Sequence, residues 1–262
     1  MSSDPLFDLA GRVAVVTGGM GQLGQVYLAG LADRGMRVAS FDVAGGLVPD
    51  GARAYQVDIT DRASIDAALE SVTDEWDVPH VLVNNAGLDS PPDAPAEEVG
   101  RFEDYSEAAF DEVMDVNVKG TLLCCQAVGG AMAREGRGSI VNVSSVYGLL
   151  SPPQDLYEFR RVQGETFFKP VAYSVSKSAV LNLTRYLATY WAKEGVRVNT
   201  LTLGGVENDQ PAEFLDAFAA RSPLGRMLDA REALGAVVFL ASDASSYVTG
   251  SNVVVDGGWS AW

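Results

Sequence analysis

Short valine-rich apolar runs alternate with longer segments of helical periodicity, and this alternation constrains the fold more than any other feature. We predict a buried strand at each run bounded by Gly, Asp or Asn, namely Arg12–Thr17, Arg37–Asp42, Arg53–Val57, His80–Asn84, Ser139–Val143, Val196–Leu203 and Asn252–Asp256. Strands that take turns with helices indicate a parallel sheet with right-handed crossovers and helices on both faces. The expected fold class is therefore α/β, a doubly wound, Rossmann-like parallel sheet of seven strands.

One inter-strand segment shows the helical pattern most clearly. A helix over residues 61–76, with Thr60 as its N-cap, would place four apolar side chains on one face: Ile65, Leu69, Val72 and Trp76. We find no internal repeat or flexible linker, so residues 1–262 are expected to form a single domain.

Composition excludes several classes of partner. A formal net charge of −16 and a pI near 4.3 oppose binding to DNA, RNA or an anionic membrane. No apolar stretch approaches the roughly 20 residues of a membrane span, and Met1–Asp8 resembles no targeting signal, so we expect a cytoplasmic protein. Cys124 and Cys125 are sequence neighbours and are expected to be buried thiols.

Two segments break the alternation, Leu88–Asp104 with Pro91, Pro92 and Pro95, and Ser151–Pro170. Neither can be a regular helix throughout, and both follow strands, so they should lie at the carboxyl edge of the sheet, where ligands bind in such folds. We therefore expect substrate-side loops at 88–104, 148–170 and 205–227. Surface decoration is the alternative.

A glycine-rich loop follows the first strand and precedes a helix that should begin near Gln22. Glycines allow close approach to a pyrophosphate, and the free N–H groups of a helix amino terminus favour an anion. The expected cofactor-binding residues of this loop are Gly18, Gly21, Gln22, Leu23 and Gly24. A glycine loop alone is equally compatible with a simple turn.

Asp42 ends the second predicted strand, 18 residues after Gly24. An acidic side chain there can accept hydrogen bonds from the adenosine ribose hydroxyls, and residues 18–24 contain no Arg or Lys for a 2′-phosphate. We therefore expect NAD rather than NADP as the cofactor. A turn or cap role for Asp42 is the alternative.

Tyr173 and Lys177 stand four residues apart at the start of a predicted helix, so their side chains share one face. A phenol has an ordinary pKa of about 10, and a nearby ammonium helps to lower it toward neutrality. Such a pair by itself occurs often on exposed helix surfaces.

The surrounding motifs make the pair specific. They occur in order along the chain: Thr17-Gly18 with its glycine loop, Asn84-Asn85-Ala86-Gly87, Val116-Asn117-Val118, Ser144-Ser145, Tyr173-Ser-Val-Ser-Lys177 and Asp256-Gly257-Gly258. Together they resemble the short-chain dehydrogenase/reductase family over essentially the whole chain.

This resemblance implies four catalytic residues. Tyr173 would be the general acid/base, and Lys177 would lower its pKa and bind the nicotinamide ribose. Ser145, rather than Ser144, would hydrogen-bond the substrate oxygen. Asn117 would hold a water that links Lys177 to solvent. Besides the glycine loop and Asp42, the implied cofactor contacts are Asp58, Ile59, Asn85, Ala86, Gly87, Tyr173, Lys177, Gly204 and Val206, with Asn84 steadying the central strand.

The chain departs from the family pattern at a few places. Gln22 stands where the short branch usually has Gly, which resembles the spacing of the extended, sugar-nucleotide-modifying branch. Leu203-Gly204 replaces the usual Pro-Gly, and Asn208 replaces a frequent Thr. The segment between Ser145 and Tyr173 is also longer than is usual in the family.

We expect an NAD-dependent oxidoreductase that moves a hydride between nicotinamide and a secondary alcohol or ketone on a sugar, polyol or sugar acid. A 3-oxoacyl thioester reductase is the first alternative, and Asp42 argues against it. A catalytically silent binding protein and a sugar-nucleotide epimerase or dehydratase are two further alternatives. The intact Asn117, Ser145, Tyr173 and Lys177 set opposes the former.

The extra segment supplies candidate substrate contacts, namely Tyr157, Arg160 and Arg161. Arginine suits the capture of a carboxylate, so we expect a polar and even acidic carbohydrate. Equally, these arginines could pair with Glu158, Glu165 or other acidic groups.

The remaining expectations concern partners and metal. The resemblance implies a homo-oligomer, a tetramer, packed through the helices around Leu122–Met132 and Tyr173–Trp191. The tail Trp259–Trp262 would be covered there or folded on its own subunit. No metal site is expected, and His80 is expected to be structural or merely exposed.

Overall fold

The predicted strands form one sheet in the computed structural model, which describes residues 4–90 and 99–262. The strands are β1 (Val13–Thr17), β2 (Arg37–Asp42), β3 (Ala52–Gln56), β4 (Val81–Asn84), β5 (Gly138–Ser145), β6 (Val196–Leu203) and β7 (Asn252–Val255). Their order is β3-β2-β1-β4-β5-β6-β7, and every neighbouring pair is parallel. The predicted doubly wound, seven-stranded sheet is confirmed.

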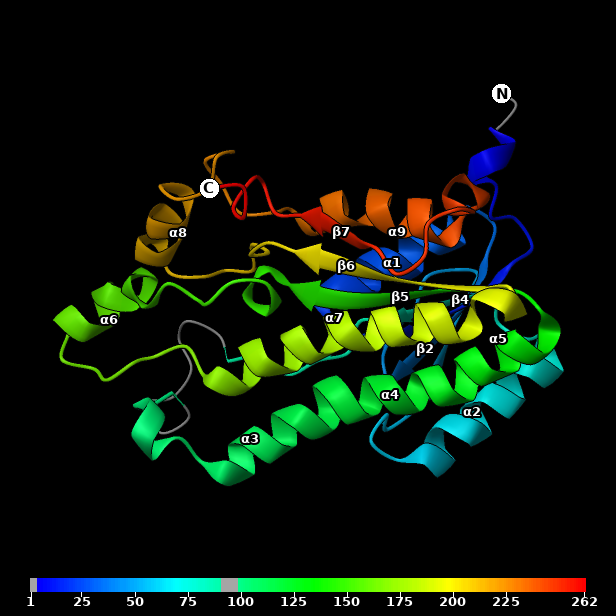
Figure 1. Cartoon of the computed structure of the whole chain (residues 1–262), viewed down its shortest axis with the longest axis horizontal. Coiled ribbons are helices and arrows are strands. Elements are labelled where there is room, and N and C mark those ends of the chain that lie inside the picture. The colour runs from blue at the N-terminus through cyan, green and yellow to red at the C-terminus, as the bar shows by residue number, and fades with distance from the viewer. Residues whose placement is uncertain (1–3, 91–98) are drawn as a thin grey trace.

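Helices cover both faces of this sheet (Figure 1). On one face lie α2 (Arg62–Glu75), α3 (Glu107–Met114), α4 (Thr121–Cys124), α5 (Gly130–Glu135) and α7 (Val171–Trp191), and on the other lie α1 (Gln22–Ala32) and α9 (Leu234–Ala241). Successive side chains of a strand point to opposite faces. Val13 and Val15 therefore join the core under α2, α4 and α7, whereas Ala14 and Val16 join the core under α1 and α9.

The first turn of α2 differs from the prediction. Asp61, not Thr60, caps the helix, because its side chain accepts a hydrogen bond from the Ala63 N–H at 2.9 Å. The Thr60 hydroxyl donates instead to Asp58 Oδ1 at 2.7 Å, so it is no longer available as a cap. The apolar face is as expected, since Ile65 and Val72 are fully buried and Leu69 and Trp76 pack against them.

Residues 107–135 stay helical but include two π-helical stretches, Asp115–Gly120 and Cys125–Gly129. A π-helical turn inserts an extra residue and often marks a functional site. Asn117 lies in the first stretch. Cys124 and Cys125 are buried free thiols, as predicted.

A cap of irregular chain and short helices covers the carboxyl ends of the strands. It contains α6 (Glu158–Val162) and α8 (Ala212–Ala219), which lie beyond the arrowheads of β5, β6 and β7 in Figure 1. Its own apolar cluster consists of Val99, Val146, Leu156, Tyr157, Phe167, Phe214, Phe218, Met227 and Trp259. Pro91, Pro92 and Pro95 lie outside the described residues.

Candidate active site

A cleft of about 390 Å³ lies at the carboxyl ends of β4, β5 and β6. It brings together side chains that are far apart in the sequence. Among those predicted from the sequence, the cleft is lined by Gln22, Leu23, Asn85, Gly87, Ser145, Tyr157, Tyr173, Lys177, Gly204 and Val206.

Lys177 is buried at the base of the cleft, with 6% of its surface exposed. Its Nζ donates to the carbonyl of Val143 at 3.2 Å and lies 5.8 Å from the centre of the Tyr173 ring. Burial lowers the pKa of Lys177 to about 8, and the Asp89 carboxylate acts in the opposite direction. The ammonium is thus poised to lose its proton near neutral pH.

The pKa of Tyr173 departs from the direction that the resemblance implies. Burial raises this pKa above its ordinary value, and the negative charge of Asp89 raises it further. A hydrogen bond with the Ser145 side chain lowers it. In the protein alone, desolvation of the phenolate therefore dominates the Tyr173 pKa, and the expected lowering by Lys177 is not observed.

The two serines at the end of β5 point to different partners. Ser144 Oγ donates to the backbone carbonyl of Lys177 at 2.8 Å and so fixes α7 against the strand. Ser145 Oγ accepts from the Tyr147 N–H at 3.2 Å and is the serine that bonds Tyr173. The structure therefore places Ser145, rather than Ser144, beside the Tyr173 phenol.

Asn117 is buried beside these residues. Its Oδ1 accepts from the Leu88 N–H at 2.7 Å, and its Nδ2 donates to the Leu88 carbonyl and to Ser176 Oγ, both at 3.0 Å. A Cβ atom placed on Gly87 would lie 3.2 Å from both Asn117 Oδ1 and Lys177 Nζ. Asn117 thus holds the chain after β4 against α7, close to the ammonium.

The glycine loop forms a cradle with no room for side chains at two of its predicted positions. Gly18 has φ +64°, and a Cβ on Gly24 would lie 2.1 Å from the Gly18 carbonyl oxygen. Gly21 caps α1 without a side-chain hydrogen bond, so the first N–H groups of the helix remain free for an anion. These features fit the pyrophosphate of a dinucleotide.

Neighbouring side chains fix this cradle. Asn85 Nδ2 donates to the carbonyls of Thr17 and Gly18, and Thr17 Oγ1 accepts from the N–H groups of Asn85 and Ala86. Gln22, the departure from the family pattern, donates through Nε2 to the Glu207 carbonyl at 2.6 Å. The Gln22 side chain therefore ties the glycine loop to the segment after β6.

Asp42 lies at the end of β2 beside the cradle. Its Oδ2 accepts from the Met20 N–H and its Oδ1 from the Ala44 N–H, each at 2.9 Å. The part-buried carboxylate therefore fixes the turn, which is the role that the alternative interpretation of Asp42 gave it.

The other predicted cofactor residues lie around the same edge. Asp58 accepts from Thr60, and hydrogen bonds from that residue lower the pKa of the Asp58 carboxyl. Ile59 is buried. Gly204 N–H donates to the Val255 carbonyl, and Val206 forms an isolated bridge with Leu228.

The predicted substrate residues differ in whether they line the cleft. Tyr157 lines the cleft, although it is 1% exposed and stacks on Phe167 at 4.6 Å. Arg160 pairs with Glu165, and Arg161 pairs with Glu158 at 2.6 Å. Neither arginine lines the cleft. Both arginines thus form the ion pairs that were the alternative to substrate binding. Glu158 and Glu165 can reach them because each lies within a few residues of its arginine in the same segment.

The cleft residues that were not predicted as site residues include Asp89, Tyr147 and Lys169. Asp89 follows directly on the Asn-Asn-Ala-Gly motif and Tyr147 on the Ser144-Ser145 motif, so adjacency to a strand end was the available signal. Lys169 lies in the same extra segment as Arg160 and Arg161, and the sequence alone does not distinguish these three basic residues.

Other expectations concern the rest of the described chain. His80 is structural, since its Nδ1 accepts from the Val13 N–H at 3.2 Å. Residues 4–90 and 99–262 contain no group of three or more metal-ligating side chains placed to hold an ion. In the same residues, no helix is long and apolar enough to cross a membrane.

A glycine cradle at a helix amino terminus, joined to a cleft lined by Ser145, Tyr173 and Lys177, defines an oxidoreductase that uses a nicotinamide dinucleotide. Residues 24–260 match the family described as "Enoyl-(Acyl carrier protein) reductase". The chain belongs to the short-chain dehydrogenase/reductase family, and it is an enzyme that acts on CH–OH groups.

Named relatives align over nearly the whole chain. Cis-4-hydroxycyclohexanecarboxylate dehydrogenase of Sinomonas cyclohexanicum is 35% identical over 96% of this chain and 98% of its own. D-threitol dehydrogenase of Mycolicibacterium smegmatis is 35% identical over 99% of this chain and 96% of its own. Galactitol 2-dehydrogenase of Rhizobium johnstonii is 34% identical over the full length of both chains.

Solved structures share the fold. A short chain dehydrogenase from Leptospira borgpetersenii with bound NAD+ has a TM-score of 0.87 and 29% identity, covering 99% of this chain and 96% of that one. A gluconate 5-dehydrogenase from Burkholderia cenocepacia in complex with NADP and tartrate has a TM-score of 0.84 and 28% identity, covering 98% of each chain.

Proposed function

We propose that this enzyme is an NAD-dependent dehydrogenase that oxidises a secondary alcohol of a polyol, sugar or sugar acid to a ketone. The observation that carries this proposal is the convergence of Ser145, Tyr173 and Lys177 in one cleft next to a dinucleotide cradle. The named relatives support the substrate class, because they include dehydrogenases of threitol, galactitol and gluconate.

Each residue has a distinct part in the reaction. Ser145 and Tyr173 would hold the substrate hydroxyl, and the Tyr173 phenolate would take its proton. Bound NAD supplies the hydride acceptor. Lys177 would hold the nicotinamide ribose, with its Nζ 5.8 Å from the centre of the Tyr173 ring. Asn117 keeps Gly87, Leu88 and α7 in register around the ammonium.

Asp42 supports NAD as the cofactor. A 2′-phosphate near this carboxylate would meet a like charge, and residues 18–24 and 43–51 offer no Lys or Arg. The first basic residue after Asp42 along the chain is Arg53, which pairs with Glu75. Reduction of an acyl thioester generally draws on NADPH, so the same feature disfavours that alternative.

We also propose a homo-oligomer, a tetramer, formed through α7. This helix exposes Val175, Tyr186 and Tyr190, and the two tyrosine rings stack at 6.0 Å. The helical stretch 122–132, which was expected to share the interface, packs mainly into its own core through Cys124, Cys125, Val128 and Met132. In the tail, Trp259 stacks on Phe218 of its own chain, whereas Trp262 remains 81% exposed.

A substrate screen tests the proposed function. We expect the enzyme to reduce NAD in the presence of at least one tetritol, hexitol, sugar or aldonate, followed as NADH absorbance. Activity confined to hydroxyacyl thioesters, or to alcohols without further hydroxyls, would contradict the proposed substrate class.

A further inference from the structure

An ion pair forms part of the cleft wall beside the phenol. Lys169 Nζ lies 2.5 Å from Asp89 Oδ1 and 2.6 Å from the Ser90 carbonyl oxygen. The Lys169 side chain is only 4% exposed, and its Nζ lies 5.1 Å from the centre of the Tyr173 ring. Both members of the pair line the same cleft as Ser145 and Tyr173.

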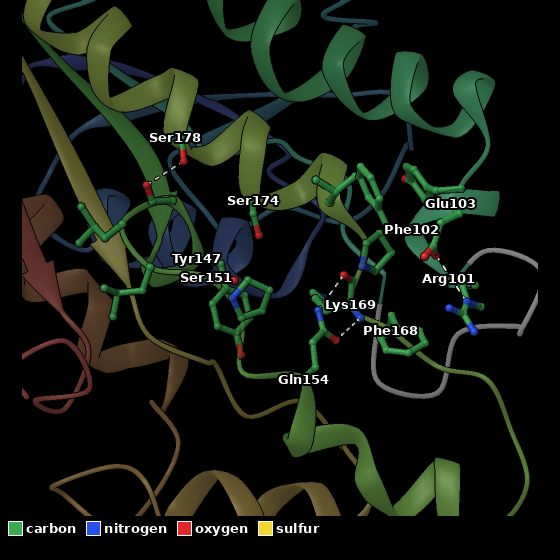
Figure 2. A pocket seen from close by; sticks show the side chains of 18 residues that line it. Arg101, Phe102, Glu103, Tyr147, Ser151, Gln154, Phe168, Lys169, Ser174 and Ser178 are labelled. Atoms are coloured by element: carbon green, nitrogen blue, oxygen red, sulfur yellow. Dashed lines mark hydrogen bonds and ion pairs between the residues drawn. The ribbon is translucent and has the colours of Figure 1, made fainter.

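The backbone of Lys169 is fixed from both sides. Its N–H donates to Gln154 Oε1 at 2.9 Å, and Gln154 Nε2 donates to its carbonyl at 3.4 Å, as Figure 2 shows. The preceding residue, Phe168, donates its N–H to the Val99 carbonyl. Lys169 and Tyr147 also line a neighbouring cavity of about 600 Å³, so they form the wall between the two spaces. A substrate in the cleft therefore meets this pair at one end.

Asp89 is the charge that most broadly affects the cleft. Burial is the main cause of the raised pKa values of Tyr147, Tyr157 and Tyr173, and the Asp89 carboxylate raises all three further. Such an effect requires the carboxylate to lie close to the reacting phenol. Its position is thus suited to contact a substrate held by Tyr173.

The charges on the cleft wall are balanced. Among the described lining residues the charged ones are Asp89, Lys169, Lys177 and Asp209. The ammonium of Lys169 already faces Asp89, and Lys177 donates to Val143 beside the dinucleotide cradle. The sequence of residues 91–98 adds no Lys or Arg. The described cleft thus offers a substrate carboxylate no uncommitted cation.

Resting on the proposed function, we propose that Asp89 and Lys169 are specificity-determining residues that select a neutral polyhydroxylated substrate over a sugar acid. Asp89 Oδ2 has no partner among the described residues, and two of the three Lys169 N–H groups are engaged. A hydroxyl both donates and accepts, so neighbouring hydroxyls of a polyol can donate to Oδ2 and accept from the remaining N–H. A carboxylate only accepts, and it would meet the like charge of Asp89.

The test compares matched substrates on one enzyme. We expect the wild type to show a kcat/KM with NAD about tenfold or more higher for glucitol, galactitol or threitol than for gluconate, galactonate or threonate, respectively. In Asp89→Asn, Lys169 becomes an unpaired cation, so the polyol-to-aldonate ratio of kcat/KM should fall by about tenfold or more. If Asp89 had a merely structural role, the substitution would lower kcat/KM for the polyol and for the aldonate together and leave their ratio unchanged.

Asp155→Asn is the matched control, because Asp155 lies in the same cap, pairs with Arg221 and does not line the cleft. The polyol-to-aldonate ratio of kcat/KM in this control variant should equal that of the wild type. NADH binding, followed by fluorescence, should be the same in all three proteins, which shows that each is folded.

The outcomes separate this inference from the proposed function. If the wild type prefers aldonates, or if Asp89→Asn leaves the ratio unchanged, the selection by Asp89 and Lys169 is wrong while the proposed dehydrogenase stands. If neither polyols nor aldonates are oxidised, both the proposed substrate class and this inference fail.

Discussion

Lys177 lies one helical turn after Tyr173 on α7, with its Nζ 5.8 Å from the phenol ring centre and 3.2 Å from the Val143 carbonyl oxygen. The ammonium thus lies between the phenol and the end of β5, in a place shielded from water. Burial lowers its pKa to about 8, from an ordinary value near 10.5. The position needed for chemistry therefore carries a cost in stability.

We predict that Lys177→Met stabilises the cofactor-free protein at pH 7. Below pH 8 the folded chain must bury a charged ammonium, a cost on the order of 3 kcal/mol. Between about pH 8 and 10.5 the unfolded chain keeps the proton that the folded chain has lost, so the wild type regains stability as pH rises. The difference in the free energy of unfolding, measured in urea from pH 6.5 to 9.5, should therefore shrink with increasing pH.

Lys193→Met is the control for this experiment, because Lys193 is exposed just after α7. Its stability difference from the wild type should not vary with pH. A constant difference for Lys177→Met as well would show that the Lys177 pKa is not lowered in the folded protein.

Because the Asp42 carboxylate would repel a 2′-phosphate, we expect NADH to bind about tenfold more tightly than NADPH. This ratio corresponds to about 1.4 kcal/mol. Asp42→Asn removes the charge and keeps the size of the side chain with one of its two acceptor oxygens, so it should reduce this preference mainly by improving NADPH binding. Fluorescence titration with both cofactors measures the effect. Asp50→Asn, an exposed change in the following loop, should leave the preference intact. Equal affinities in the wild type would contradict the role of Asp42.

Asn117 should be structurally indispensable. Asn117→Ala would remove the partner of both backbone groups of Leu88 and one of the two hydrogen bonds of the Ser176 hydroxyl, and we expect a loss of roughly 2 to 4 kcal/mol in the free energy of unfolding. Asn182→Ala, at an exposed position of α7, should cost little. Similar urea midpoints for the two variants would show that the Asn117 hydrogen bonds contribute little.

We expect subunits to associate through the exposed tyrosines of α7. Tyr186→Glu combined with Tyr190→Glu would place charges on the proposed apolar interface and should reduce the tetramer to smaller species in light scattering. Tyr247→Glu, at a fully exposed site outside α7, should remain a tetramer. A wild-type protein that is monomeric at micromolar concentration would rule out this interface.

The strands and the catalytic cluster could be predicted because their signals are local. Valine runs specify buried parallel strands, and strand ends in such a sheet meet at one edge, which brings Ser145 next to Tyr173. The Thr60 cap was wrong because the next residue, Asp61, caps the helix, whereas the Thr60 hydroxyl donates to Asp58. This choice of cap depends on side-chain geometry that spacing does not reveal.

The substrate side could not be predicted in the same way. Lys169, Arg160 and Arg161 are close in sequence, yet only Lys169 reaches the cleft, because Glu158 and Glu165 hold the arginines within the segment. The partner of Lys169 is Asp89, 80 positions away in the chain. Pairings over that distance follow from the assembled cap rather than from any pattern along the sequence.

The turnover of Tyr173→Phe with NAD and the best polyol from the screen is the most direct test of the proposed proton transfer by Tyr173. The variant keeps the ring but loses the hydroxyl, so we expect kcat to fall by about a thousandfold or more while the Kd for NADH changes less than about threefold. Tyr190→Phe, an exposed change on the same helix, should retain wild-type turnover. Substantial activity in Tyr173→Phe would show that another group transfers the proton and would contradict the proposed role of Tyr173.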